Sequence, residues 1–170
     1  KMSKRAGNFI LMSDVVSEIG SDALRFVFLS KKSDTHLEFD VDVFKQEDSN
    51  NPIFYINYAH ARINQIFAKA GKSVNDIKNV SLDSMNEEAQ NLLFSALLLP
   101  EVLEDAFSSR QVQKVTEYLK NLAAALHKFY NENRVVGSVE EEQLLKLFAV
   151  VALSLRVGLK LIGITAKDKM

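Results

Sequence analysis

The chain has 170 residues, of which 47% are apolar, and 21 basic against 22 acidic side chains give it a net charge of -1. Average apolar and charged fractions exclude wholesale disorder, and the length suits one domain with a hydrophobic core. The absence of cysteine excludes disulfides, thiolate metal sites and cysteine nucleophiles. Because a net charge near zero provides no long-range field for polyanions, composition alone places nucleic-acid binding low among the functions.

Glycine, proline and capping residues divide the chain into segments with helical periodicity. Ser13 and Ser21 can each cap a short helix, and Gly20 between them suits a helix end. The alternating residues 36–39 could be extended, and the polar stretch 72–85 is typical of a loop. The predicted helices are, in chain order, 14–19, 22–30, 41–47, 51–71, 86–99, 109–132 and 138–162.

Three of these helices have the strongest signals. One begins at Asn51 and Pro52, a capping residue followed by the residue best suited to the first helical position. The segment 109–132 carries apolar residues at alternating steps of three and four, as a helix seam does. The last helix is expected to start at a capping box formed by Ser138 and Glu141. The sequence therefore predicts an all-α bundle of four or five main helices, preceded by a short irregular lead.

The most apolar stretch, residues 144–164, is long enough to span a bilayer. It contains Lys146, Arg156 and Lys160, and charges inside a membrane helix are costly. We therefore expect a buried helix and no membrane partner. The chain starts at Lys1, with no secretory signal pattern, and we expect it to be part of a longer protein.

The three histidines do not form a metal or catalytic motif. His36, His60 and His127 are far apart in sequence, and no His-Glu-x-x-His spacing, phosphate-binding glycine loop or Gly-x-Ser-x-Gly elbow is present. His60 follows the apolar face of its helix and is expected to be a hydrogen-bonded core residue. The sequence predicts no metal site.

The first residues are different, because Lys1, Met2, Ser3, Lys4 and Arg5 place three cations beside a hydroxyl. Such a segment is either a solvated basic tail or a loop that contacts a polyphosphate. The sequence of this segment resembles the KMSKS signature of class I aminoacyl-tRNA synthetases, with Arg5 where the last serine usually stands. The resemblance implies that residues Lys1 to Lys4 contact ATP and that Lys4 is catalytic, stabilising the adenylate-forming transition state.

Four further stretches resemble one branch of that family, the arginyl-tRNA synthetases. Asp22–Arg25 spell the DALR tetrapeptide, which names an anticodon-binding domain shared with the cysteinyl enzymes. The other stretches, in the order in which the family has them, are Asn51–Ile63, His127–Val135 and Gly158–Ile164 with the terminal Met170. Because the matches cover nearly the whole chain, chance similarity is a poor explanation.

The resemblance implies a division at residue 48. Residues 1–48 would be the KMSKS-like loop and the connecting helices at the end of a catalytic domain, and residues 49–170 the helical anticodon-binding domain. It further implies a cytoplasmic, monomeric arginine-tRNA ligase that uses ATP with Mg²⁺, arginine and arginine tRNA. Because the HIGH motif and Rossmann part are not among these residues, the chain alone is expected to be inactive. The alternatives are a cysteinyl enzyme and a helical protein-interaction module.

Two stripes of aromatic and basic residues are candidates for binding RNA. Tyr58 and Arg62 share a face of one predicted helix, and Tyr130 and Arg134 share a face of the long one. Rings and guanidinium groups stack on unpaired bases, although a tyrosine beside a core stripe can equally be a packing residue. The family resemblance adds Met170, since the pocket for the central anticodon base there combines a tyrosine with the C-terminus.

Overall fold

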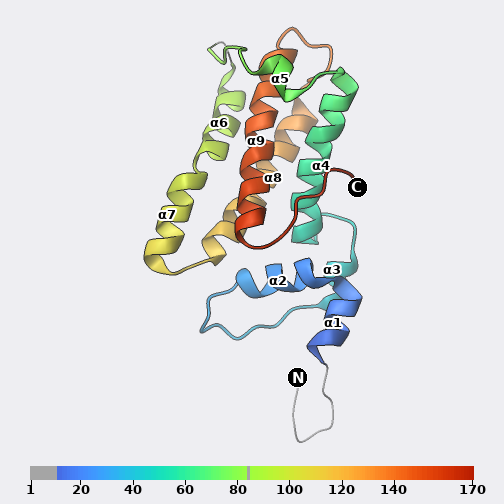
Figure 1. The fold of residues 1–170 in the computed structure, drawn as a ribbon, viewed down its shortest axis with the longest axis vertical. Coiled ribbons are helices and arrows are strands. Elements are labelled where there is room, and N and C mark those ends of the chain that lie inside the picture. The colour runs from blue at the N-terminus through green and yellow to red at the C-terminus, as the bar shows by residue number, and fades with distance from the viewer. Residues whose placement is uncertain (1–10, 84) are drawn as a thin grey trace, which may run out of the picture.

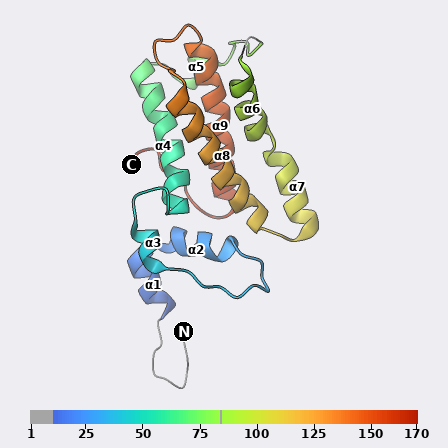
Figure 2. The same ribbon diagram turned by 180° about the vertical axis from the view of Figure 1, so that it is seen from behind.

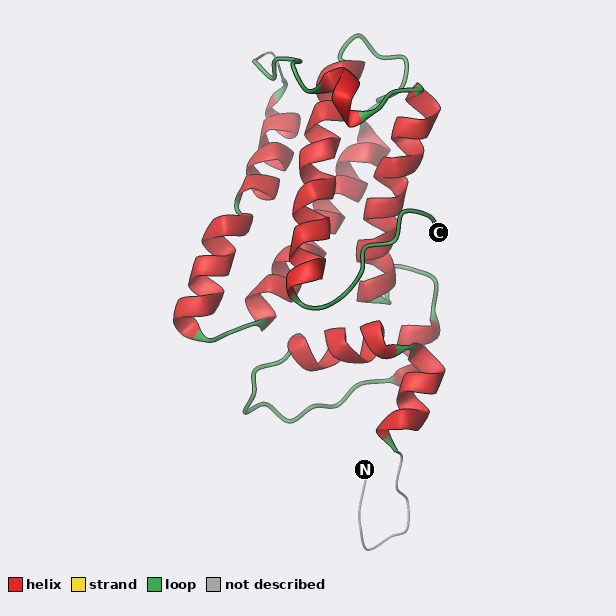
Figure 3. Ribbon diagram, in the orientation of Figure 1, coloured by secondary structure: helices red, strands yellow, loops and turns green. Residues whose placement is uncertain are grey.

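The computed structural model describes residues 11–83 and 85–170, and every regular element in this part of the chain is an α-helix (Figure 3). The predicted all-α class is therefore confirmed. The helices are α1 (Met12–Ile19), α2 (Ser21–Leu29), α3 (Val41–Lys45), α4 (Pro52–Ala70), α5 (Val74–Ile77), α6 (Glu87–Leu97), α7 (Leu99–Ser109), α8 (Gln113–Glu132) and α9 (Glu141–Leu161).

The long helices α4, α8 and α9 run side by side, and α6 with α7 forms a broken helix along the other flank of the bundle (Figure 1). Helix α2 lies across one end of this bundle, next to α1 and α3, as the view from behind also shows (Figure 2). After α9 the chain turns back and its C-terminal segment lies beside α4. The predicted bundle is thus closed at one end by the short N-terminal helices.

Helix α9 is the central element of the core. It packs against α4, α5, α6 and α8, and Leu145, Leu147 and Phe148 are fully buried on it. Gly158 allows α8 to approach closely, because a Cβ at this position would lie 2.7 Å from Cδ2 of the buried Leu119. This burial on nearly every side explains why the sequence of α9 is so uniformly apolar.

The short helix α2 belongs to the same core. Ala23 and Phe26 are buried within the hydrophobic cluster that α4, α8 and α9 share. The DALR tetrapeptide therefore has a packing role at Ala23 and Leu24, while Arg25 is exposed and lies against Gly163. Among the described residues, no helix is long and apolar enough to cross a membrane.

The break between α6 and α7 differs from expectation. The sequence pattern ends a helix at Pro100 and assigns no helix until about residue 109, yet α7 continues the chain with Pro100 in its first turn. A proline is accepted there because the first N–H groups of a helix need no intrahelical acceptor. In a continuous helix the N–H of residue 100 would bond to the carbonyl of Ala96. The hydroxyls of Tyr118 and Ser154 donate to that carbonyl instead, at 2.8 and 2.9 Å.

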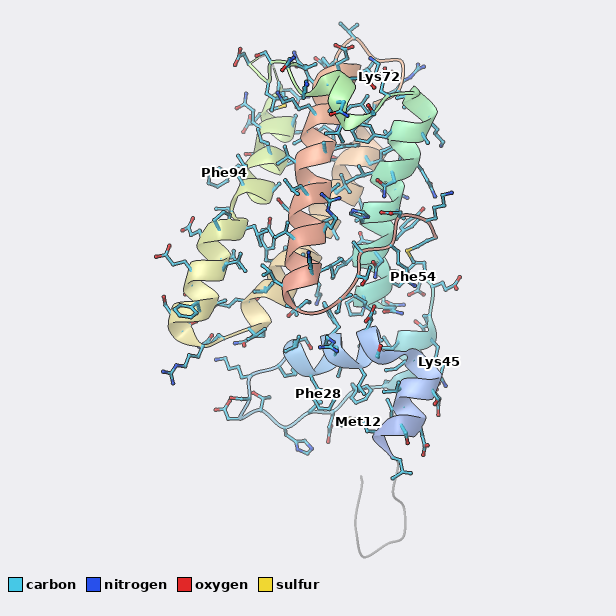
Figure 4. The ribbon with its side chains drawn as sticks, viewed as in Figure 1. Met12, Phe28, Lys45, Phe54, Lys72 and Phe94 are labelled. Atoms are coloured by element: carbon cyan, nitrogen blue, oxygen red, sulfur yellow. The ribbon has the colours of Figure 1, made fainter. Side chains whose placement is uncertain are left out.

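The predicted capping box at the start of α9 is wrong. Ser138 does not cap the helix, because its hydroxyl donates to the carbonyl of Val135 in the preceding turn. Glu141 is instead the first residue of α9, and its Oε2 accepts the N–H of Gly137 at 2.6 Å. That hydrogen bond and the nearby Lys72 ammonium lower the pKa of the Glu141 carboxyl. Lys72, labelled in Figure 4, also pairs with Glu142 at 2.8 Å and so ties the end of α4 to the start of α9.

Smaller local expectations also need correction. Ser13 lies inside α1 and Ser21 is the first residue of α2, so neither serine is an N-cap. Gly20, with φ of 83°, does end α1 as expected. The predicted loop 72–85 contains the single turn α5, and residues 36–39 form no strand.

Candidate functional site

The packing of α4 against α8 joins the two predicted stripes. Tyr58 and Arg62 on α4 meet His127 and Tyr130 on α8, because the buried faces of these two helices pack against each other. The phase of α4 is fixed at its start by Asn51, which accepts the N–H of Phe54 through its side chain. Two residue sets about seventy positions apart in the chain therefore form one surface.

Arg62 is the centre of this surface. Its Nη2 donates to the hydroxyl of Tyr58 at 2.9 Å, and its Nη1 lies 2.9 Å from Nδ1 of His127. The guanidinium carbon is 4.5 Å from the ring centroid of Tyr58 and 4.9 Å from that of Tyr130, both within cation–π range. Among the described residues its hydrogen-bonding partners are uncharged, so its positive charge remains available to an anionic ligand.

A row of rings extends from Arg62 toward the N-terminal end of α4. The rings of Tyr58 and His127 are stacked with centroids 5.4 Å apart, and those of Phe54 and Tyr58 are stacked at 6.0 Å. The ring of Tyr55 lies against His127 with centroids 4.3 Å apart and a tilt of 40°. Phe54, labelled in Figure 4, lies near the end of α4 that faces the short N-terminal helices. His127 is buried, but Phe54, Tyr55 and Tyr58 are partly exposed, and partly exposed rings are the kind of platform on which unpaired bases stack.

Tyr130 and Arg134 line a second part of the surface. A hollow of about 450 Å³ at the end of α8 is bordered by Tyr130, Arg134 and Lys69 of α4. The Nε of Arg134 donates to the carbonyl of Val136 at 3.1 Å, which leaves most of its guanidinium donors facing outward. Two cations beside a ring can contact phosphates that flank a stacked base.

Met170 lies elsewhere. It borders a separate hollow of about 360 Å³, lined by Phe54 and Asn57 of α4 and by Ser21 and Asp22 of α2. Phe54 therefore links the two regions, since it borders this hollow and stacks on Tyr58. The structure brings Tyr58, Arg62 and Tyr130 into contact, whereas the participation of Met170 stays a prediction.

The C-terminal segment is held against α4 by hydrogen bonds from buried polar residues. Asn57 accepts the backbone N–H of Lys167 at 2.9 Å, and Nδ1 of His60 donates to the carbonyl of Lys167 at 3.0 Å. Asn64 adds a bond to the Asp168 carboxylate at 3.1 Å. His60 is thus the hydrogen-bonded core histidine that its position on the helix predicts.

The residues predicted to contact ATP are not part of this surface as the structure describes it. Lys1, Met2, Ser3 and Lys4 lie outside the described residues. Within residues 11–83 and 85–170, no three side chains of the His, Cys, Asp or Glu types come together in a way that could hold a metal ion. Sequence reasoning also missed Phe54, although its place four residues before Tyr58 on the same helix was a usable signal.

The comparisons with known proteins agree with the sequence resemblance. The model of the DALR anticodon binding domain family matches residues 56–170. The chain belongs to this family. As a DALR domain chain it is 72% identical over 170 residues to a protein of Campylobacter curvus named arginine–tRNA ligase, and 66% identical to one of the same name from Campylobacter concisus. It spans 32% of the length of each of these two relatives.

Solved structures support the fold. A structure from Campylobacter jejuni named for an arginyl-tRNA synthetase matches with a TM-score of 0.93 and 64% identity, over 100% of this chain and 37% of that one. The arginyl-tRNA synthetase of Thermus thermophilus matches with a TM-score of 0.77 over 98% of this chain and 29% of its own. Because this second pair is only 23% identical, it supports the fold alone.

Proposed function

We propose that this DALR domain chain is the tRNA-recognising, C-terminal part of an arginine-tRNA ligase, a cytoplasmic and monomeric enzyme. The complete protein would activate arginine with ATP and Mg²⁺ and transfer it to arginine tRNA. The observation that carries the proposal is the contact of the Arg62 guanidinium with the rings of Tyr58 and Tyr130, where α4 packs against α8. The names of the relatives support arginine as the amino acid that the complete enzyme would use.

In this proposal, unstacked bases of the anticodon loop bind to the rings, and nearby cations contact the phosphates. Tyr58 and Tyr130 offer the ring surfaces, and Arg62, Arg134 and Lys69 offer the positive charges. Stacking of a base on an aromatic ring contributes roughly 1–3 kcal/mol. Local cations are sufficient for this mode of binding, which explains how a chain with a net charge of -1 can bind RNA.

The division at residue 48 and the role of the first residues belong to the same proposal. Lys1, Met2, Ser3 and Lys4 would contact ATP, with Lys4 stabilising charge on the transferring group, and Met170 would border the base-binding region. Lys1, Ser3 and Lys4 would supply two cations and a hydroxyl, so the chemistry also requires the nucleotide-binding part of the longer protein. The 170-residue chain alone is expected to bind tRNA and to make no aminoacyl-adenylate.

A titration of the ¹⁵N-labelled chain with arginine tRNA tests the proposal. We expect the amides of residues 54–62 and 127–134 to shift, because these segments carry the ring row and its cations. A helical protein-interaction module would leave the spectrum unchanged on addition of tRNA, and that result would overturn the proposal. Shifts confined to α6 and α7 would equally contradict it.

A matched pair of variants links the binding to the rings. Tyr130→Ala should weaken tRNA binding about 5- to 150-fold, the equivalent of one lost stacking partner. Phe107→Ala removes an aromatic side chain that is 85% exposed on α7, on the flank of the bundle opposite α4 (Figure 2), and should leave binding unchanged. Equal effects of the two variants would contradict the assignment of the surface.

A further inference from the structure

His127 connects Arg62 to the backbone of α4, and its two ring nitrogens face partners of opposite kinds. Its Nδ1 lies 2.9 Å from Nη1 of Arg62, and its Nε2 lies 3.3 Å from the carbonyl oxygen of Tyr55. A guanidinium can only donate and a carbonyl can only accept. Nδ1 must therefore carry the lone pair and Nε2 the proton, so both contacts require the same neutral tautomer.

The surroundings hold the imidazole ring in one orientation. His127 is only 4% exposed. The ring of Tyr58 stacks on it with centroids 5.4 Å apart, and the ring of Tyr55 lies against it at 4.3 Å with a tilt of 40°. Arg62, in contrast, is partly exposed at the end of a long flexible side chain. Fixing such a side chain before a ligand arrives removes part of the entropy that binding would otherwise cost.

We propose that His127, as its Nε2–H tautomer, is a positioning residue that holds the Arg62 guanidinium against the rings of Tyr58 and Tyr130 for contact with RNA. The ligand class is the phosphate and base of a single-stranded RNA loop. The inference rests on the proposed function and deepens it, because it says which buried group determines the geometry of the binding cation. His127 itself does not touch the RNA.

Protonation of His127 would disrupt this arrangement. An imidazolium would direct an Nδ1–H at the Arg62 guanidinium, so two donors and two positive charges would meet at hydrogen-bonding distance. Burial lowers the pKa of His127, the Tyr55 carbonyl raises it and the Arg62 charge lowers it further. The other titratable groups that face this cluster are the hydroxyls of Tyr55, Tyr58 and Tyr130.

The direction of the pH effect follows from these contacts. Above the ordinary histidine pKa of about 6.5 the ring is neutral and Arg62 is held. As the pH falls through the lowered pKa of His127, Nδ1 takes up a proton and releases Arg62. Binding of tRNA should therefore weaken on the acid side, where the phosphates and bases of the RNA keep their charge.

The test compares dissociation constants for arginine tRNA between pH 5 and 8 in four proteins. These are the unaltered chain, Arg62→Ala, His127→Phe and His127→Asn. His127→Phe keeps a ring and removes the acceptor, and should weaken binding at pH 8 about tenfold, close to the effect of Arg62→Ala. His127→Asn offers an amide oxygen near the position of Nδ1 and should restore most of the affinity without the acid-side loss.

The outcomes separate this inference from the proposed function. If Arg62→Ala weakens binding but His127→Phe does not, or if the acid-side loss persists in His127→Asn, the positioning role is overturned and the binding surface stands. If the unaltered chain binds no tRNA, the proposed function fails. Should His127→Phe not fold, the ¹⁵N shifts of the His127 ring in the unaltered chain decide, since a protonated Nδ1 at neutral pH would overturn the inference.

Discussion

Replacing Tyr118 by Phe and Ser154 by Ala together should destabilise the fold by more than the sum of the two single replacements. Both hydroxyls donate to the Ala96 carbonyl, and they do so inside the core, where Tyr118 and Ser154 are each 8% exposed. Pro100 has no N–H to offer this carbonyl, so the two side chains replace the missing helical hydrogen bond. The double replacement therefore measures how much the two hydroxyls stabilise the break between α6 and α7.

The magnitudes follow from counting donors. Either single replacement leaves the carbonyl one hydroxyl partner and should cost about 1 kcal/mol. The double replacement leaves a buried carbonyl without either hydroxyl, which adds about 1–3 kcal/mol of desolvation penalty. The coupling between Tyr118 and Ser154 should therefore be about 1–3 kcal/mol.

Urea denaturation of the four proteins at 25 °C, followed by circular dichroism, gives the required free energies of unfolding. A double replacement that is additive within about 0.5 kcal/mol would refute the reasoning. So would a Tyr118→Phe variant as stable as the unaltered chain, because it would mean that the hydroxyl contributes nothing to the Ala96 carbonyl.

Three further predictions concern stability. Gly158→Ala should cost about 1–3 kcal/mol, because its Cβ would meet the buried Leu119 at 2.7 Å, and an unchanged melting temperature would contradict this close approach. Asn51→Ala should cost about 1–3 kcal/mol in urea denaturation, since Asn51 caps α4 and also donates to the carbonyls of Phe44 and Gln46; a loss below 0.5 kcal/mol, as at an ordinary surface site, would count against it. Burial raises the pKa of Tyr118 to about 12. The contribution of Tyr118 to the free energy of unfolding is therefore complete below pH 10 and should fall by about 2 kcal/mol as the pH rises to 12. Tyr118→Phe should lack this part of the alkaline loss.

Local signals in the sequence predict most of the helices. The cap at Asn51, the following Pro52 and the left-handed Gly71 define α4 almost to the residue, because each signal acts within one helical turn. The capping box at Ser138 does not form, because the Ser138 hydroxyl donates to the Val135 carbonyl in the preceding turn. Serine side chains form such local bonds to the backbone as an alternative to capping a helix.

Contacts between distant segments lie beyond such signals. The stripes on α4 and α8 are visible separately, but only the packing of the two helices shows that Arg62 meets both Tyr58 and Tyr130. Likewise, α7 depends on hydroxyls from α8 and α9 that satisfy Ala96. Whole-chain charge gives no information about such a surface, because it averages over the molecule whereas the proposed RNA binding depends on a few local cations and rings.

The most direct test of the central claim is the ratio of the dissociation constants of the 170-residue chain for arginine tRNA and for the same tRNA with its anticodon replaced. The account predicts tighter binding of the native anticodon, by about tenfold or more if one base-specific contact is lost. It also predicts a shallow salt dependence, of about -0.7 in log–log slope for each phosphate contacted. Equal dissociation constants for the two tRNAs would contradict the claim that the surface formed by α4 and α8 reads the anticodon.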